Sequence, residues 1–510
     1  LKSGEETSRK SVEDLLLGFK GKNLAVVFGD DISPTRSRLV EQLGATAYRY
    51  EPLSPEGRFE SDGKGIVSAV DYTGATRILS LDCDFTELDY RGSTKPFSAN
   101  RQPEKADYSL AKDEKAILDR TEKELNRLYI AEAGFSLTGG LADHRKRLAP
   151  SQMEAFIKQL TVAVNGGKTD DRWIDTCAAD LLANKGHSVI LLGGRYEAKL
   201  HNAVNKLNEV LGANGPIVKA YKSDERPATK SLVANPGELA DKDAIIWMSP
   251  GNPSYDNTAV AQALSKSKAT VIHWGERTDH TALDADYHVP AANYLESWGD
   301  TRTATGIYTL IQPMIKPLYG GVTELELLTA LVKNETLFNS LNEGEETPAY
   351  AEVEKIAKAF GADWMQIRRE GFAERTQYPV ESISGGNASL NAAADASGVD
   401  VIFATDHSVY DGRYINNAWL QEAPDPIVKL TWDNAAWMAP ATATKLGIFT
   451  PGEEAGELEV RAKPSVLADA ARISGKVNGG VGPEGEAHFR TGRMVDITLP
   501  NGSVIEIPVI

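Results

Sequence analysis

The segment DAIIWMSPGNPSYD (residues 243–256) decides the fold that we expect for this chain. Residues 244–248 are apolar, which predicts a short buried strand. Gly251, Asn252 and Pro253 follow at once and predict a tight turn, because these residue types favour turns and new element starts. In open α/β sheets, ligands bind beyond the carboxyl ends of the strands. The segment therefore raises the question of whether a nucleotide-bearing cofactor is held there.

The same pattern of an apolar run followed by turn residues recurs along the first two thirds of the chain. It predicts strands at 23–28, 77–82, 127–132, 188–194, 243–248 and 269–275. Amphipathic patterns between most of them predict helices, so we expect an α/β fold with a largely parallel sheet. Helix starts are predicted where a cap residue precedes the helical pattern: Ser33 before Pro34, Ser151 with Glu154, and Thr323 with Glu326.

The pattern changes from about residue 450. Residues 456–460 and 494–510 alternate apolar and polar side chains with period two, and Asn501-Gly502 is typical of a type I′ hairpin turn. We therefore expect a β-rich C-terminal domain, part of a barrel. The acidic segment NEGEETP (342–348) is expected to separate the α/β body from this tail.

Composition excludes several classes of function. The 510 residues predict three or four domains, and 55 Lys+Arg against 72 Asp+Glu give a net charge of −17. This charge repels phosphate backbones, so no nucleic-acid partner is expected. No apolar run approaches the roughly 18 residues of a membrane helix, so no direct span is expected. The two cysteines, Cys83 and Cys177, are too few for an iron–sulfur cluster, and no His/Cys group has metal-site spacing.

Two short motifs are assigned structural roles. The GxGxxG match formed by Gly480, Gly482 and Gly485 lies between β-like segments, whereas a dinucleotide fingerprint must open a helix. Asp406-His407 is a lone pair in a polar loop. We expect a loop at both places.

The predicted strand ends carry mixed signals for a phosphate ligand. Gly193-Gly194-Arg195 has the small residues and the positive charge that a phosphate needs. By contrast, carboxylates follow two other strands, at Asp30-Asp31 and around Cys83 at Asp82 and Asp84. We expect these carboxylates to be uncompensated and to repel a pyrophosphate.

Three motifs give the chain a family resemblance. MSPGNP followed by residues 269–300 resembles the molybdopterin-oxidoreductase family, in which an Asn-Pro turn precedes a segment whose spacing is matched here by Asp279, Asp286, Pro290 and Glu296. Residues 127–150, with Thr138, Ala142 and Asp143, are similar to a second family segment. Residues 126–145, 310–328 and 408–448 also resemble a narrower family, the molybdopterin-oxidoreductase-like subunits of alternative complex III, a bacterial quinol:electron-acceptor oxidoreductase.

The resemblance implies a domain plan. It consists of two intertwined doubly wound lobes, a connecting segment and the β-rich, barrel-like domain. The first lobe would take residues 20–125 and 236–320, and the second 126–235. Residues 321–400 would form the helical and loop connection, and 401–510 the C-terminal domain.

The resemblance also implies a function. In this narrower family the molybdopterin-oxidoreductase-like half has lost its cofactor, and a ferredoxin-like half carries the iron–sulfur clusters. That half is absent here, so we expect a fragment or one product of a split subunit. We expect no cofactor, metal or catalytic residue in this chain, and a scaffold role that joins the iron–sulfur protein to quinol-oxidising membrane subunits and cytochrome c subunits. It would lie peripherally on the periplasmic side of the bacterial inner membrane.

Two alternatives remain open. One is an active molybdenum or tungsten bis-pterin oxidoreductase, in which Ser136 or Thr138 is the metal ligand and the cofactor contacts are Gly193, Gly194, Gly251, Asn252 and Pro253. The other is an unrelated, self-sufficient α/β enzyme. A scaffold should expose large apolar patches when isolated, which a self-sufficient enzyme should not. Residues 408–426, rich in Tyr, Trp, Asn and Arg, are either a docking surface or packing at a domain junction.

Overall fold

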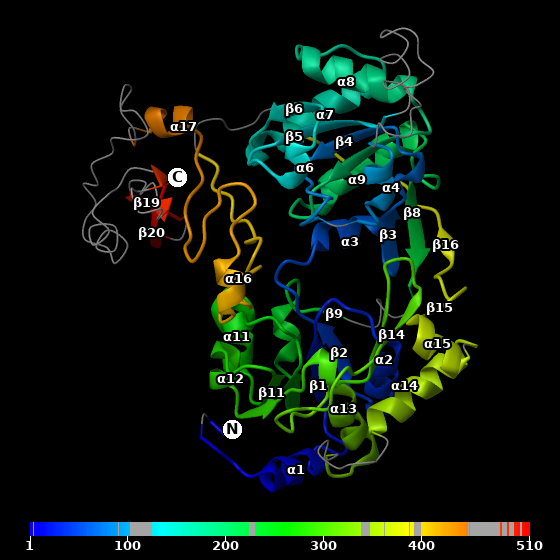
Figure 1. Cartoon of the computed structure of the whole chain (residues 1–510), viewed down its shortest axis with the longest axis vertical. Coiled ribbons are helices and arrows are strands. Elements are labelled where there is room, and N and C mark those ends of the chain that lie inside the picture. Colours follow the sequence, from blue (N-terminus) through cyan, green and yellow to red (C-terminus); the bar gives the residue numbers. More distant parts are fainter. Residues whose placement is uncertain are drawn as a thin grey trace. The chain divides into compact units, whose positions relative to one another are not determined.

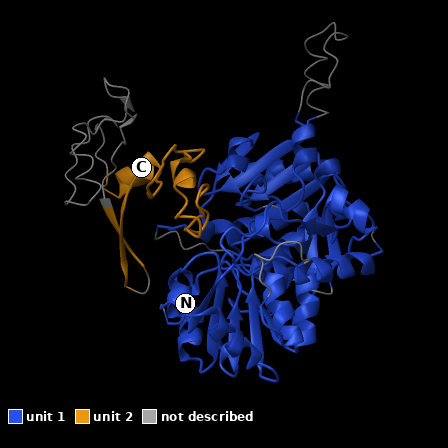
Figure 2. Ribbon diagram, turned by 60° about the horizontal axis from the view of Figure 1, so that its bottom comes forward, with its two compact units in different colours: residues 1–402 blue, residues 403–510 orange. Residues whose placement is uncertain are grey.

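The computed structural model describes residues 1–3, 5–89, 91–101, 125–223, 230–337, 347–361, 363–386, 388–391, 399–446, 448, 480–481, 487–488, 494–499 and 502–509. The chain divides into two compact units, Leu1–Ile402 and Phe403–Ile510 (Figure 2). Each unit is described by itself.

A six-stranded sheet with the strand order β12-β11-β10-β1-β2-β9 contains the strand predicted at 243–248 (Figure 1). All five strand pairs are parallel. Its strands are β1 (Leu24–Phe28), β2 (Thr46–Arg49), β9 (Lys230–Ser231), β10 (Ala244–Trp247), β11 (Thr270–Gly275) and β12 (Tyr287–Pro290). Leu24 of β1 pairs with Ala244 of β10, so the sheet joins two distant parts of the sequence.

The connections of this sheet confirm several predictions. Helix α2 (Pro34–Leu43) joins β1 to β2. It begins where predicted, because the Ser33 side chain accepts from the Arg36 backbone and Pro34 is the first helical residue. It ends at Gly44, whose φ of +68° suits glycine. Between the following strands lie α10 (Pro253–Asp256), α11 (Thr258–Lys266) and α12 (His280–Asp284).

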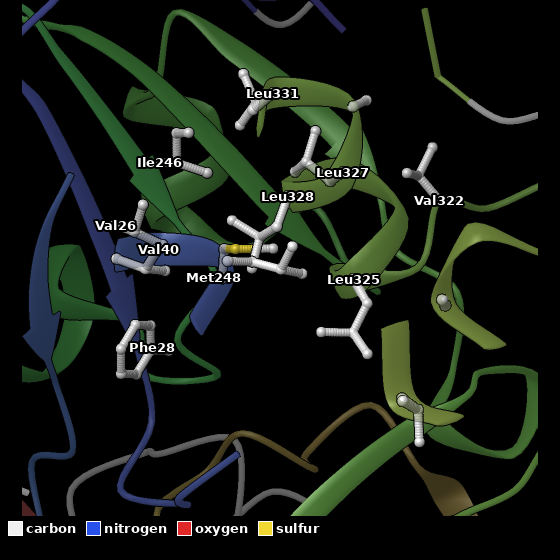
Figure 3. Packing of buried hydrophobic residues seen from close by; sticks show 14 of the residues in the cluster. Val26, Phe28, Val40, Ile246, Met248, Val322, Leu325, Leu327, Leu328 and Leu331 are labelled. Carbon is white, nitrogen blue, oxygen red and sulfur yellow. The ribbon is translucent and has the colours of Figure 1, made fainter. Parts of the chain in front are cut away.

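Strand alternation gives the six-stranded sheet two apolar faces. Val26 and Phe28 of β1 point into one core, and Ala25 and Val27 point into the other. Helix α13 (Glu324–Lys333) packs its leucines on the first face, over Val26 and Ile246 (Figure 3). Its predicted capping box, Thr323 with Glu326, is confirmed.

The region 321–400 adds to this core. Helices α1 (Arg9–Leu17), α14 (Pro348–Ala359) and α15 (Trp364–Glu370) bury side chains in the same cluster as β1 and α13. The expected separation of body and tail at NEGEETP (342–348) was therefore wrong, because α14 begins at Pro348 and packs into the body. Residues 342–346 lie outside the described residues.

A second parallel sheet has the order β6-β5-β4-β7. Its strands are β4 (Arg77–Leu81), β5 (Arg127–Glu132), β6 (His144–Arg147) and β7 (Ser188–Leu192). One face packs on the helices α7 (Met153–Val164), α8 (Arg172–Ala183) and α9 (Ala198–Val210). The predicted capping box at Ser151 was wrong. A short 3-10 turn precedes α7, and the Ser151 hydroxyl instead donates to Asp400 Oδ2 at 2.8 Å.

Smaller antiparallel sheets complete the first unit. One has the order β16-β8-β3, from Val380–Glu381, Val218–Lys222 and Ile66–Val70, and helix α3 (Glu56–Asp62) packs against β3 and α9. The other contains β13 (Gly299–Arg302), β14 (Tyr308–Ile311) and β15 (Phe372–Ala373). The expected first-lobe range 20–125 contains strands of both parallel sheets, because β4 lies between β5 and β7.

The second unit contains α16 (Ala418–Glu422), α17 (Pro440–Lys445) and two antiparallel strand pairs. β17 (Gly480–Val481) pairs with β18 (Ala487–His488), so Gly480 opens no helix. β19 (Met494–Thr498) pairs with β20 (Val504–Pro508). The Leu499 amide donates to Ser503 O, which leaves three residues between them instead of the two of a type I′ turn. Asn501 and residues 456–460 lie outside the described residues.

Within the described part of the chain, we find no helix with the length and apolar character needed to cross a membrane.

Candidate functional site

Four loops at the carboxyl ends of parallel strands form the region where a ligand of such a sheet would bind. They are residues 29–33 after β1, 249–253 after β10, 82–84 after β4 and 193–195 after β7. We refer to them as the strand-end loops. The first two belong to the six-stranded sheet and the other two to the four-stranded sheet, so the predicted contacts at 193–194 and at 251–253 lie in different sheets.

The loop after β10 is packed against its own strand and β2. The Gly251 amide donates to Ser249 Oγ at 3.0 Å, and Trp247 Nε1 donates to Gly251 O at 3.2 Å. A Cβ atom on Gly251 would lie 2.7 Å from ring atoms of Tyr50. The glycine is therefore required by close packing against an aromatic ring of the chain itself.

Asn252 and Pro253 complete the predicted turn. Asn252 Oδ1 accepts from Thr281 N at 3.0 Å and from Thr281 Oγ1 at 2.8 Å. The Asn252 amide donates to Asp256 Oδ2 at 3.0 Å. Pro253 is buried and begins α10. These polar atoms thus hold the loop to α10 and α12.

The loop after β1 leads into the first turn of α2, where an anion would be favoured by the helix dipole. A carboxylate of the chain already lies there. Asp300 accepts from the Thr35 amide (Oδ2, 3.2 Å) and from the hydroxyls of Ser33 and Tyr308. Asp300 is only 2% exposed, and this burial raises its pKa, against the hydrogen bonds that lower it.

The acidic side chains of this loop have cationic partners. Arg49 Nη1 lies 2.9 Å from Asp30 Oδ1, and Arg36 Nη1 lies 2.9 Å from Asp31 Oδ2. Arg36 also pairs with Glu324, at 3.1 Å. Burial opposes the charge of Arg36, but the two carboxylates outweigh it and raise its pKa. The expectation of uncompensated carboxylates was wrong here, because the partners come from other elements.

In the loop after β4, a cation compensates one of the two carboxylates, Asp82, whereas no ion pair is found for Asp84 among the described residues. Asp82, with a φ of +49°, pairs with Arg195 Nη2 at 2.9 Å and accepts from Tyr196 Oη at 2.8 Å. Asp84 Oδ1 accepts from Thr138 N at 3.0 Å and from Thr138 Oγ1 at 2.6 Å. Cys83 between them is buried, and burial raises the pKa of its thiol well above the usual value.

The loop after β7 meets a further carboxylate, Asp89. The Gly194 amide donates to Asp89 Oδ1 at 2.8 Å, and the Asp84 amide donates to Asp89 Oδ2 at 3.2 Å. The Gly193 amide donates to Leu81 O at 3.0 Å, and a Cβ atom on Gly193 would collide with the Asp82 carbonyl. Gly193 is thus required by a backbone contact within the chain, and the Gly194 amide is already bonded within it.

The other candidate ligands also have structural roles. Ser136 caps α6 (Leu137–Gly140), and its hydroxyl donates to Glu132 Oε2 at 2.6 Å. Cys177 lies in α8 and is fully buried, and burial raises the pKa of its thiol. Asp406 Oδ1 accepts the backbone amides of Ser408 and Val409, so the Asp-His pair belongs to a turn. No group of three or more His, Cys, Asp or Glu side chains able to hold a metal occurs among the described residues.

The strand-end loops as they stand do not fit a phosphate-bearing cofactor. A phosphate needs backbone amides and cations that are open to it. Here the amides of Thr35, Asn252 and Gly194 donate to carboxylates of the chain, Asp300, Asp256 and Asp89. Sequence reasoning missed these partners. Asp89 lies close to Asp84 in sequence, but nothing near Ser33 in sequence indicates Asp300.

Similarity to known proteins is found among solved structures and not in the sequence comparisons. No family model matches the sequence, and no curated protein matches it. Among solved structures, the chain is similar to acetylene hydratase from Pelobacter acetylenicus, with 11% identity and a TM-score of 0.48 over 74% of this chain and 65% of that one. It is also similar to a chain of the formyltransferase/hydrolase complex from Methylorubrum extorquens, with 12% identity and a TM-score of 0.43 over 65% of this chain and 97% of that one. The chain thus spans just under two thirds of the acetylene hydratase chain.

Proposed function

We propose that this chain is a cofactor-free scaffold of the molybdopterin-oxidoreductase type within a bacterial respiratory quinol:electron-acceptor oxidoreductase, as its resemblance to the corresponding subunits of alternative complex III implies. Its role is to position the iron–sulfur half beside the quinol-oxidising membrane subunits and the cytochrome c subunits. On this proposal the complex lies on the periplasmic side of the inner membrane, and the iron–sulfur clusters belong to a ferredoxin-like half or to a partner chain.

One observation carries the proposal beyond the sequence resemblance. Each of the strand-end loops is filled by side chains of the chain itself, which hold the amides or the space that a cofactor phosphate would use. The α/β architecture with two parallel sheets is the frame that the resemblance implies. On this proposal, the position where such a fold binds its cofactor is occupied by side chains of the chain itself.

An exposed apolar surface supports the scaffold role. We define the 294–319 patch by six exposed side chains from two segments: Tyr294, Leu295, Met314, Ile315, Leu318 and Tyr319. The segments are joined by a hydrogen bond from the Met314 amide to Leu295 O, at 2.7 Å. Tyr319 is 96% exposed, a high value for a large aromatic residue. Apolar side chains gathered in this way are typical of a surface that a partner covers.

The first test is metal and pterin analysis of the purified native complex. We expect iron but no molybdenum, tungsten or pterin. Stoichiometric metal and pterin in this chain would overturn the proposal. It would favour the alternative, an active oxidoreductase with contacts at Gly193, Gly194, Gly251, Asn252 and Pro253.

A second test addresses the 294–319 patch in the native complex. The double variant Met314→Ser, Tyr319→Ser should reduce co-purification of the iron–sulfur protein. Aromatic and apolar side chains at the centre of an interface contribute much of its binding free energy. Met365→Ser is the matched control, since Met365 on α15 is 70% exposed but lies outside the patch. Full recovery of the complex with the double variant would remove the patch as the docking surface.

A further inference from the structure

We propose that the β4 and β7 strand-end loops form an anion-binding site, which the Asp89 carboxylate fills from within the chain. Without that carboxylate, the site would accept a small oxyanion such as formate, acetate or inorganic phosphate. This inference deepens the proposed function, because it explains how one ligand position is closed. Its geometric basis does not depend on membership in any complex.

The site is defined by two backbone amides. β4 and β7 are neighbours in register, with Leu81 opposite Leu192, so the loops that follow them lie side by side. Gly194 N donates to Asp89 Oδ1 at 2.8 Å and Asp84 N donates to Asp89 Oδ2 at 3.2 Å. One carboxylate therefore bridges the ends of two strands, with one amide on each oxygen, as a bound carboxylate or phosphate would.

A tight turn delivers the carboxylate. The amides of Glu87 and Asp89 both donate to Asp84 O, at 3.1 and 2.9 Å. Asp89 therefore folds back onto the loop from which it came. A Cβ atom on Gly194 would lie 3.1 Å from Asp89 Oδ1, so glycine leaves the room that this oxygen occupies. Asp89 is half-buried in this position.

A buried cation supports an anion at this position. Arg58 on α3 interacts electrostatically with Asp89, and its Nε is buried without a hydrogen-bond partner among the described residues. Burial and the neighbouring Arg91 lower the pKa of Arg58 to about 10. Asp62 also interacts electrostatically with Arg58, whereas Asp82 has Arg195 as its partner. Removing Asp89 would leave the two amides without their acceptor and would take one of two carboxylates, Asp62 and Asp89, away from Arg58.

The experiment is chemical rescue of Asp89→Ala. Thermal unfolding of the full chain is followed in formate, acetate or inorganic phosphate, against sodium chloride at equal ionic strength. We expect these anions to raise the midpoint of Asp89→Ala by about 2 °C or more at concentrations tenfold above Kd. The wild-type chain should show no such shift, since Asp89 occupies the site.

Asp400→Ala is the matched control. Asp400 also accepts a backbone amide and a hydroxyl, from Ser151 at 3.2 and 2.8 Å, but in an exposed position. Rescue confined to Asp89→Ala supports the proposal. Absence of rescue overturns it, and so does an equal shift in the wild type or in Asp400→Ala, which would place the anion elsewhere.

A second variant covers the case in which Asp89→Ala does not fold. Asp89→Asn keeps the shape but places an amide donor where one oxygen accepted. We expect faster amide hydrogen exchange at Gly194 or Asp84, read by mass spectrometry, and unchanged exchange at both would overturn the proposal. Either result is independent of the metal and pterin analysis, so failure here would not be confused with failure of the proposed function.

Discussion

The two parallel sheets end in comparable loops but fill them in different ways. In the six-stranded sheet the carboxylate is Asp300, which lies 267 residues beyond Ser33, is almost fully buried and binds the start of α2. In the four-stranded sheet it is Asp89, which lies five residues beyond Asp84 and is half-buried. Asp300 comes from a distant strand and belongs to the buried core, whereas Asp89 comes from a local turn. We therefore expect the loss of Asp89 to destabilise the fold less than the loss of Asp300. The difference between the two sheets predicts a graded set of effects.

The largest effect is expected for Asp300→Ala. The change leaves the donors of Ser33, Thr35 and Tyr308 without their acceptor in a buried place. Unfolding free energy should fall by about 3–5 kcal/mol, measured by urea denaturation. Asp89→Ala should cost only about 1–2 kcal/mol. Equal losses at the two positions would remove the distinction drawn between the sheets.

The next effect concerns the glycine that precedes the Asp89 contact. Gly193→Ala would push a methyl group against the Asp82 carbonyl, which is backbone and cannot turn away. We expect a loss of about 2–4 kcal/mol of unfolding free energy. Gly237→Ala is the control, because a Cβ atom there meets nothing within 4 Å. If Gly193→Ala and Gly237→Ala have the same unfolding free energy in urea denaturation, glycine is not required at position 193.

Acid should destabilise the unit Leu1–Ile402 through three buried histidines. His273 Nδ1 lies 2.9 Å from His288 Nδ1 in the six-stranded sheet, and His273 Nε2 lies 3.5 Å from Asp279. Burial lowers the pKa of each of these histidines to about 4, and the neighbouring His273 adds to the effect at His288. In α9, burial with Arg91 and Arg58 lowers the pKa of His201 to about 3.

The sign follows from these values. An unfolded histidine has a pKa near 6.5, so unfolding takes up protons below that pH. Stability is full above about pH 6.5 and falls as the pH drops toward 4, by about 2–3 kcal/mol per histidine. His288→Gln and His201→Gln should each flatten the pH dependence of the unfolding free energy. An unchanged slope in both would show that these histidines are already charged in the fold.

The smallest effect is expected at the rim of the six-stranded sheet. The Asp31 side chain is 55% exposed, and Arg36 keeps Glu324 as a partner when Asp31 is removed. Asp31→Ala should therefore cost no more than about 1 kcal/mol. Glu324→Gln should cost more, since Arg36 is buried. A double-mutant cycle by denaturation would measure the coupling.

Local patterns in the sequence predicted the local structure well. The strands at 77–82 and 243–248 and the helix start at Ser33-Pro34 were confirmed, because apolar runs and caps act over a few residues. Ser151 shows the limit of such patterns. Its sequence fits a capping box, but Asp400 competes for the hydroxyl from far along the chain.

The filling of the site was beyond local reasoning for the same reason. The strand-end positions of Asp30, Asp31, Asp82 and Asp84 were predicted correctly. The cationic partners of three of these carboxylates were not predicted. Asp30 pairs with Arg49 of β2, and Asp31 pairs with Arg36 of α2. Asp82 pairs with Arg195 in the loop after β7. Charge sign can be read from sequence, but charge compensation depends on the tertiary fold. The resemblance to a known family led to the expectation that this chain holds no cofactor, and that expectation stays a prediction.

The order of strands in the six-stranded sheet has a consequence for synthesis of the protein. The Asn23 amide donates to Asp243, which follows 220 residues later in the sequence. One edge of β1 therefore stays unpaired until β10 has been synthesised. At about 5–20 residues per second, the ribosome takes roughly 10 to 45 s to cover that distance. The four-stranded sheet, whose strands lie between these points, is complete first. Over that interval the nascent chain therefore carries an apolar strand whose β10 edge is unpaired, and chaperone binding at residues 24–28 would protect it.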